Sequence, residues 1–203
     1  MLFNLRNKSF KYILYKILTV ILCVFWSALL LLNFAQCTAK SYIYPLKFKQ
    51  MVFELSDKYG LERALIFSII KVESGFDGKA TSPAGAIGLM QITPNTAKYI
   101  AKLQGIEEYD LTSPNTNIAF GCFYVKYLIV KFDDLNTALV AYNAGEGNVA
   151  LWLNNPKYSS DKKTLKYIPF KESREYVEKI NETFIKYKKL YGNILINSSK
   201  STN

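Results

Sequence analysis

The start of the chain contains an uninterrupted apolar stretch that limits what this part of the protein can fold into. Four basic residues precede it with no acidic residue to offset them: Arg6, Lys8, Lys11 and Lys16. The run from Ile17 to Ala35 is 19 residues long, and no charge occurs between Lys16 and Lys40. About 20 apolar residues are needed to span a bilayer. Because the run has no polar stripe to face water, it predicts export or membrane insertion.

Three fates of this segment remain open. Cys37-Thr38-Ala39 offers a small-residue site for cleavage of a signal peptide, although a poor one. Without cleavage the segment is a membrane anchor. Lipidation at Cys37 is the third fate, with Gln36 an unfavourable residue before that cysteine. In each case the basic end stays in the cytoplasm and the rest of the chain lies in the cell envelope, on the periplasmic side.

The composition excludes several kinds of catalytic site. The 203 residues include no histidine, so Ser-His and Cys-His pairs and histidine-ligated zinc are impossible. Three cysteines, Cys23, Cys37 and Cys122, are too few and too scattered for a cysteine-only metal cluster. Cys122 falls in an apolar helical run and is interpreted as a core residue. We therefore predict no metal and no cofactor, and carboxylates as the proton-transfer groups.

The rest of the chain is predicted to be almost entirely helical, from apolar spacing and cap signals. The expected helices are a segment closed by Gly60, followed by 64–74, 94–103, 114–132, 135–143, 149–153 and 172–190. Glycines and Pro83 make 75–92 a loop with at most a small hairpin, and 154–170 is a polar connection. We expect a signal or anchor over 1–41, one helical domain over 42–192 and a polar tail over 193–203.

Glu73 stands where a charge is unexpected, at the end of an apolar helix. Helical spacing places it on the same face as Ile66, Ile69 and Ile70, whereas Lys71 lies about 200° round the helix. Burial and the negative end of the helix dipole both raise the pKa of such a carboxyl. A carboxylic acid that is protonated near neutral pH can act as a general acid. The alternative is a helix-end glutamate that turns to solvent or caps a loop, and the helix alone does not decide between the two.

Three further motifs follow Glu73 and give it a context. In chain order, the four motifs are Glu73-Ser74-Gly75-Phe76, Gly85-Ala86-Ile87-Gly88-Leu89-Met90-Gln91, Ala141-Tyr142-Asn143-Ala144-Gly145 and Ile168-Pro169-Phe170-Lys171-Glu172-Ser173-Arg174-Glu175-Tyr176-Val177. Tyrosine rings and amides suit sugar faces and N-acetyl groups. Together the four motifs resemble the soluble lytic transglycosylase family over about residues 45 to 190. That resemblance implies an all-α, lysozyme-like domain and cleavage of bacterial peptidoglycan.

The resemblance also implies a mechanism centred on Glu73. This residue would be the single acid/base, protonating the β-1,4 bond between N-acetylmuramic acid and N-acetylglucosamine. The same carboxyl would then take the proton of the muramic 6-hydroxyl, which closes on C1 to give a 1,6-anhydro end. Because the N-acetyl group of the sugar assists, no second carboxylate is required, unlike the usual two-carboxylate scheme.

The resemblance further implies a set of substrate-binding residues: Ser82 near the acid, Met90 and Gln91 lining the cleft, Tyr142 and Asn143 on a sugar ring, Glu172 placing the N-acetyl group, and the aromatic Tyr176. Tyr142 could instead be a packed tyrosine at a helix end. Glu172 could be favoured only by the helix dipole. Ser173 departs mildly from the family pattern, which usually has threonine there. The lysine-rich stretch 154–167 matches no motif, and it is either a basic rim facing anionic glycan stems or a solvated loop.

Two other functions remain open. One is a hydrolase on the same fold, like a goose-type lysozyme, and the other is a non-catalytic module that binds the cell wall. The expected partners are peptidoglycan strands and, through the N-terminal segment, a membrane, with no nucleic acid. A small domain with a membrane segment also suits local opening of the wall for a secretion or envelope-spanning machine.

Overall fold

The computed structural model describes residues 2–196, with side chains for 12–34, 38 and 42–196. The chain divides into two compact units, one ending at Pro45 and the other beginning at Leu46. Residues 197–203 of the expected polar tail lie outside the described residues, as does the side chain of Cys37.

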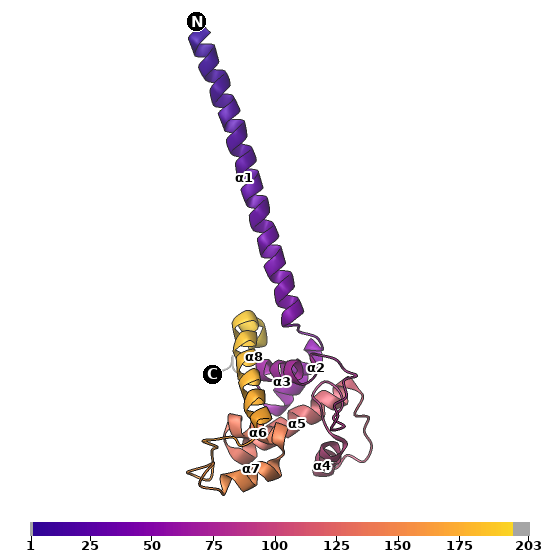
Figure 1. Cartoon of the computed structure of the whole chain (residues 1–203). Coiled ribbons are helices and arrows are strands. Elements are labelled where there is room, and N and C mark those ends of the chain that lie inside the picture. Colours follow the sequence, from indigo (N-terminus) through magenta and orange to yellow (C-terminus); the bar gives the residue numbers. More distant parts are fainter. Residues whose placement is uncertain (1, 197–203) are drawn as a thin grey trace, which may run out of the picture. The chain divides into compact units, whose positions relative to one another are not determined.

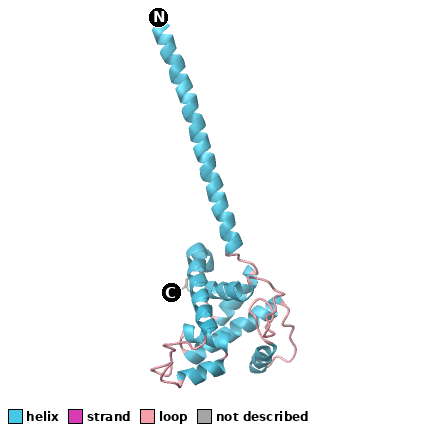
Figure 2. Ribbon diagram, in the orientation of Figure 1, coloured by secondary structure: helices cyan, strands magenta, loops and turns pink. Residues whose placement is uncertain are grey.

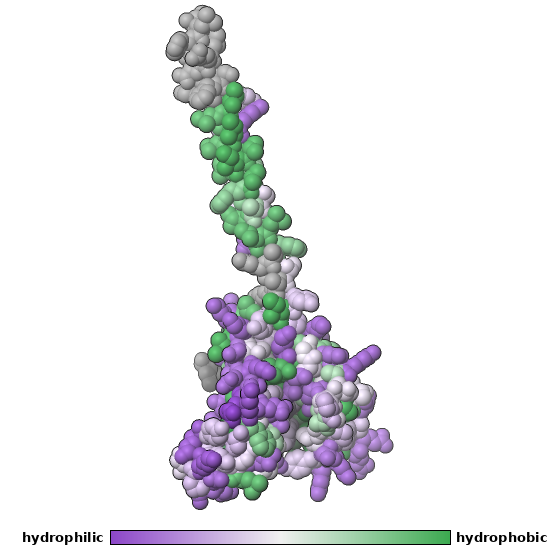
Figure 3. All heavy atoms as spheres, in the orientation of Figure 1, coloured by the Kyte–Doolittle hydropathy of each residue, from purple (hydrophilic) through white to green (hydrophobic). Residues whose placement is uncertain are grey.

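The first unit is a single helix, α1 (Leu2–Ile43). Its stretch Tyr12–Phe34 has a mean hydropathy of 2.5 over 23 residues, and none of it is buried. Figure 3 shows apolar side chains along this part of the helix. At 1.5 Å per residue the stretch is about 34 Å long, against about 30 Å for the hydrocarbon core of a bilayer. By length and composition α1 can cross a membrane, and a signal sequence has the same properties.

The described part of the second unit contains seven helices and no strand (Figures 1 and 2). They are α2 (Lys49–Tyr59), α3 (Arg63–Ser74), α4 (Pro94–Gln104), α5 (Pro114–Phe132), α6 (Leu135–Ala144), α7 (Glu146–Leu153) and α8 (Lys171–Leu195). The prediction of a helical domain is therefore confirmed.

Helix α3 forms the centre of this unit. Every residue from Ala64 to Ile70 is buried, as expected of a helix that is apolar on all sides. Helix α8 packs along α3, and the ring of Phe67 stacks on Tyr187 of α8 with centroids 5.6 Å apart. Helix α5 packs on α2 and α6, and its Cys122 is fully buried, as predicted for a core residue. Burial raises the pKa of that thiol, which keeps it unreactive.

A threonine or serine that caps the helix, followed by a proline, predicts a helix start at Thr93-Pro94 and at Ser113-Pro114. Helix α4 shows both features, whereas α5 shows only the proline. Thr93 Oγ1 accepts the Thr96 N–H at 3.1 Å, and Pro94 opens α4. Ser113 makes no side-chain cap bond, although Pro114 follows it in the same way. Since proline has no N–H to satisfy and a backbone already suited to the first helical position, α5 begins on the proline alone.

Helices α7 and α8 are longer than the spacing predicts. Helix α7 begins at Glu146, three residues early and directly after Gly145, which has a φ of 87°. Helix α8 is interrupted by non-helical backbone at Tyr191, directly after its predicted last residue, Leu190, and continues beyond this kink, through Gly192, to Leu195. Tyr191 and Leu195 are both buried. Their burial offsets the roughly 1 kcal/mol that a glycine costs a helix.

The loop between α3 and α4 is held by isolated contacts. Ile87 pairs with Thr81 and with Ile92 in two single antiparallel bridges. The Ser82 N–H donates to the Ala86 carbonyl at 3.0 Å, which closes a tight turn. The small hairpin that the sequence allows is therefore reduced to bridges, and the loop folds back on itself beside the end of α3.

Candidate active site

Glu73 occupies the last turn of α3 and is half-buried. Ile66, Ile69 and Ile70, on the same face of the helix, have no exposed surface. Burial raises the pKa of the Glu73 carboxyl from 4.5 to about 7, because the charged form loses hydration there. This direction agrees with the prediction from the isoleucine face. The carboxyl therefore has the protonation behaviour of a proton donor near neutral pH.

Tyr176, on α8, is the direct partner of this carboxyl. Its phenol donates a hydrogen bond of 2.7 Å to Glu73 Oε1. The bond favours the ionised form and lowers the pKa of Glu73, but by less than burial raises it. Burial and the nearby Glu73 charge raise the pKa of Tyr176 well above 10, so the phenol keeps its proton at neutral pH. The packing of α8 on α3 thus brings the last of the four motifs against the first.

The glycine-rich loop is fastened to the end of α3 and to itself. Ser74 Oγ donates to the Leu89 carbonyl at 2.9 Å. Gln91 has a left-handed φ of 49°, and its Nε2 donates to the carbonyls of Ala80 and Gly88 at 3.1 and 2.9 Å. The amide nitrogen of Gln91 is thus used within the loop, which leaves Oε1 as its remaining polar atom for a ligand.

Met90 supports the loop from inside the core. Its side chain has no exposed surface and packs on α5, where a Cβ added to Gly121 would lie 2.2 Å from Met90 Sδ. The Met90 carbonyl accepts a 2.7 Å hydrogen bond from Tyr142 Oη. Any part that Met90 plays in substrate binding therefore goes through the loop that it holds, since its thioether does not reach the surface.

Tyr142 and Asn143 end α6 beside these groups. The ring of Tyr142 packs against that of Tyr124, with the two ring centroids 5.7 Å apart. The Tyr142 phenol is fixed on the loop by the bond to the Met90 carbonyl, and burial, with a smaller effect of the Glu73 charge, raises the pKa of Tyr142 well above 10. Asn143 Oδ1 accepts a 2.7 Å bond from Ser173 Oγ, a buried group in the first turn of α8. Both predicted residues are thus at the site, with their side chains largely engaged in packing and support.

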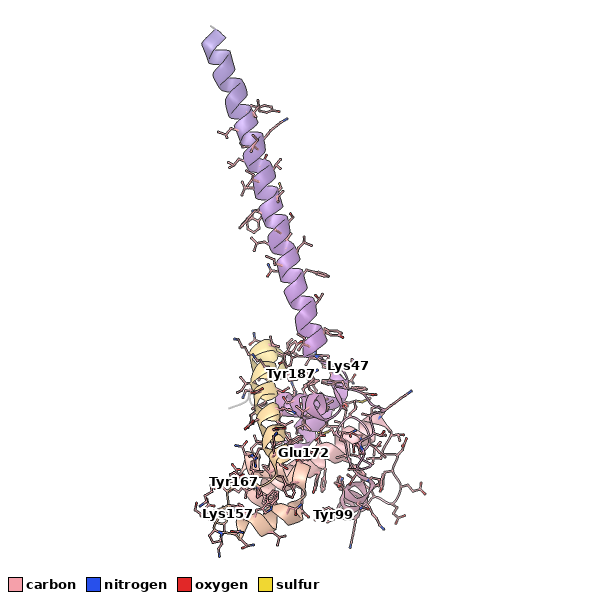
Figure 4. The ribbon with its side chains drawn as sticks, in the orientation of Figure 1. Lys47, Tyr99, Lys157, Tyr167, Glu172 and Tyr187 are labelled. Atoms are coloured by element: carbon pink, nitrogen blue, oxygen red, sulfur yellow. The ribbon has the colours of Figure 1, made fainter. Side chains whose placement is uncertain are left out.

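Ser82 and Glu172 lie further out. Ser82 Oγ accepts the Ala86 N–H at 3.0 Å, within its own turn of the loop. Glu172, labelled in Figure 4, lies in the first turn of α8 and is exposed. It is four residues before Tyr176, on the same face of the helix. The structure therefore places Glu172 one helical turn from the partner of the acid, while its contact with a substrate stays a prediction.

Asn117 is a structural residue that the sequence patterns did not single out. It is buried on α5, and its Oδ1 accepts the Met90 N–H at 2.8 Å. Its Nδ2 donates to the carbonyls of Ile87 and Leu111 at 2.8 and 3.1 Å. A Cβ on Gly88 would lie 2.5 Å from this amide, so a glycine is needed there. The available signal was its helical spacing: Asn117 stands on the buried face of an apolar helix, where an amide must have partners.

The arrangement supports acid/base chemistry by one group. Among the residues that the structure describes, no second carboxylate is hydrogen-bonded to Glu73, and its direct polar partner is a neutral phenol. A carboxyl with a pKa of about 7 can give up a proton and take one back at neutral pH. The site therefore fits a reaction in which one residue acts first as an acid and then as a base.

The chain is similar in sequence to a family of known proteins. The family model described as "Transglycosylase SLT domain" matches residues 50–165. The chain is 34% identical over 143 residues to the soluble lytic murein transglycosylase of Salmonella typhimurium, covering 68% of this chain and 22% of that protein. It is 30% identical over 166 residues to the membrane-bound lytic murein transglycosylase C of Haemophilus ducreyi, covering 70% and 45%.

A solved structure has the same fold. The lytic transglycosylase Slt of Pseudomonas aeruginosa, solved as an inactive mutant, aligns with a TM-score of 0.63 and 30% identity over 76% of this chain and 26% of its own. The predicted all-α, lysozyme-like fold is thus confirmed. The chain spans less than half the length of these relatives. The matched domain, which contains Glu73, Tyr142 and the loop between them, establishes that this chain belongs to the transglycosylase SLT domain family.

Proposed function

We propose that this protein is a peptidoglycan lytic transglycosylase, with Glu73 as its single acid/base. The observation that carries the proposal is the half-buried carboxyl of Glu73, with a pKa raised to about 7 and a phenol as its direct partner. About half of such a group is protonated at pH 7. Both forms needed for an acid step followed by a base step are therefore present at neutral pH.

The proposed reaction consumes no water. The Glu73 carboxylic acid protonates the oxygen that links N-acetylmuramic acid to N-acetylglucosamine, and the bond from C1 to that oxygen breaks. The muramic 6-hydroxyl oxygen bonds to C1, and its proton passes to the Glu73 carboxylate. The acid is thereby regenerated and the product carries a 1,6-anhydro end. Tyr176 would hold the carboxylate in place between the two steps by its 2.7 Å bond.

We also propose that α1 directs the domain to the outer face of a membrane, in the periplasm, as anchor or signal. The support is the 23-residue apolar stretch Tyr12–Phe34 and the basic residues before it, which favour a cytoplasmic N-terminus. One of the relatives is named as membrane-bound. Peptidoglycan strands would then be within reach of the domain.

The reaction is tested by digesting purified peptidoglycan and weighing the products. We expect muropeptides with anhydro ends, each one water lighter than the corresponding hydrolysis product. Reducing ends in their place would show a hydrolase, and binding without turnover would show a non-catalytic module. Either outcome would refute the proposal.

Glu73→Gln tests the role assigned to the acid. The amide keeps the size of the side chain and an acceptor for Tyr176, but it cannot exchange a proton, so cleavage should fall to background. Glu182→Gln is the matched control, since Glu182 is exposed on α8, and it should retain activity. The inactive mutant of the Pseudomonas aeruginosa relative carries this type of exchange, glutamate to glutamine.

A further inference from the structure

The positive charge of the domain is concentrated in one short segment. Residues 46–153 carry ten basic and eleven acidic side chains, whereas 154–174 carry six basic and two acidic ones. This segment is the connection from α7 to α8 together with the first turn of α8. The remainder of the domain is close to neutral, so this segment dominates the attraction of the domain for an anion.

The connection has a built structure. Its two ends meet where the N–H groups of Lys166 and Tyr167 donate to the Tyr158 carbonyl at 2.9 and 3.3 Å. The rings of Tyr158 and Tyr167 stack with centroids 6.2 Å apart. Inside the loop, the Asp161 carboxylate accepts four hydrogen bonds, from Ser159, Lys163 and Thr164. These bonds lower the pKa of Asp161, so the carboxylate stays ionised at neutral pH. The same bonds fix the shape of the turn.

The lysines of the loop project outward without acidic partners. All four are exposed: Lys157, Lys162, Lys163 and Lys166. Among the residues that the structure describes, none of these ammonium groups belongs to an ion pair. Lys162 and Lys166 line one hollow together with Ser160. The only acid of the loop, Asp161, is already hydrogen-bonded by Ser159, Lys163 and Thr164, so the cations are available to an external anion.

The loop is joined to the candidate active site at both ends. It leaves α7, which is separated only by Gly145 from α6, the helix that carries Asn143, and it returns at Phe170, the residue before α8. The ring of Trp152 meets that of Phe170 edge to face, with centroids 4.8 Å apart. Along α8 the rise from Phe170 to Tyr176 is about 9 Å, and Tyr176 bonds the acid. Figure 4 labels Lys157 and Tyr167 on the loop and Glu172 on the adjoining helix.

We propose that the lysine surface formed by Lys157, Lys162, Lys163 and Lys166 binds the free carboxylates of the peptide stems on the glycan strand. This inference rests on the proposed function, which places a glycan strand at Glu73. The sugars of an N-acetylated strand are neutral, so they offer these lysines no counter-charge. The peptide stems carry side-chain and C-terminal carboxylates and project from the muramic residues, toward a loop that rejoins α8 about 9 Å along the helix from the partner of the acid, Tyr176.

The test compares binding to glycan strands whose stem carboxylates are free with binding to strands whose stem carboxylates are amidated. We would measure the Kd of the full chain for soluble stem-bearing strands and for the same strands after their stem carboxylates have been converted to neutral amides. Each protein carries Glu73→Gln so that the strands stay intact. Lys162→Gln, Lys163→Gln and Lys166→Gln are combined, since these changes keep every backbone bond of the loop. The control combines Lys102→Gln, Lys186→Gln and Lys189→Gln, which are exposed elsewhere and change the charge equally.

We expect the loop variant to bind stem-bearing strands about tenfold more weakly at low salt, since each exposed ion pair contributes about a two- to fivefold effect. Its affinity for the amidated strands should not change, and 0.5 M salt should abolish the difference on the native strands. No loss, an equal loss on both substrates, or the same loss in the control would overturn the proposal. Binding of the same proteins to vesicles of anionic lipid is measured alongside. If the loop variant lost affinity only for these vesicles, that result would also overturn the proposal, in favour of a membrane-binding surface. The separate cleavage assay with native Glu73 tests the proposed function, so the two failures are distinguishable.

Discussion

Replacing Glu73 by glutamine should change the pH dependence of stability as well as activity. The pKa of the carboxyl is about 7 in the folded protein, against 4.5 for an ordinary glutamate. Between these pH values the folded state binds more protons than the unfolded state, so the stability of the native protein falls as the pH rises. Glutamine does not titrate. The variant should therefore gain stability relative to the native protein between pH 4 and pH 8.

The size of this gain follows from the pKa. At 1.36 kcal/mol per pH unit, a rise from 4.5 to about 7 corresponds to about 3.4 kcal/mol. Because Glu73 is half-buried and keeps part of its hydration, we expect about 2 to 3 kcal/mol. For a domain of this size, 1 kcal/mol moves the Tm by about 2 to 4 °C. The Tm difference between variant and native protein should thus grow by about 5 to 10 °C from pH 4 to pH 8.

The measurement is thermal unfolding of the full chain in detergent, followed by near-ultraviolet circular dichroism at pH 4, 6 and 8. Glu182→Gln makes the same chemical change at an exposed position and should give a pH-independent difference. The variant can also differ from the native protein by an amount of stability that is the same at every pH, because the unpaired NH₂ group of the new amide has a cost of its own. Such a constant difference does not contradict the prediction. A difference for Glu73→Gln that does not grow with pH would refute the raised pKa and the mechanism built on it.

Two further substitutions test the supports of the acid. Tyr176→Phe removes a hydrogen bond to a charged group, which typically contributes about 1.5 to 3 kcal/mol. The pKa of Glu73 should rise further, and the alkaline limb of the pH–rate profile should move up by about 1 to 2 pH units; an unmoved limb would contradict the bond. Asn117→Ala leaves the Met90 N–H and two carbonyls unpaired and should cost about 2 to 4 kcal/mol in urea unfolding. The exposed neighbour Asn115 is its control, since Asn115→Ala should cost less than 1 kcal/mol.

Local patterns in the sequence were sufficient to predict the helices and the environment of the acid. The face made by Ile66, Ile69 and Ile70 is a property of one helix, so periodicity alone placed Glu73 against apolar side chains. Proline and threonine marked the start of α4 for the same local reason. The interruption of α8 after Leu190 was predicted, but its continuation beyond the kink at Tyr191 was missed, because it depends on the burial of Tyr191 and Leu195, which involves tertiary packing.

The contacts at the site are non-local, and the motifs alone could not supply them. The bond from Tyr176 to Glu73 joins residues 103 apart in the sequence. Gln91 and Met90 were predicted to line a cleft, but the Gln91 amide nitrogen is bonded within the loop and the Met90 side chain is buried. Whether a residue of a motif faces a ligand or holds its neighbours depends on the direction of its side chain, which spacing does not fix. The substrate contacts of Ser82 and of the other predicted binding residues stay predictions.

The network around the loop explains why support residues and the acid occur in the same motifs. Three helices each fasten the short segment Leu89–Met90: α3 through Ser74, α5 through Asn117 and α6 through Tyr142. A half-buried carboxyl that is destabilising at high pH can persist only if the backbone around it does not open to water. We therefore expect each of these bonds to act on the protonation of Glu73 by keeping the loop closed beside it. Substitutions at these three positions should consequently alter the pH dependence of cleavage along with its rate.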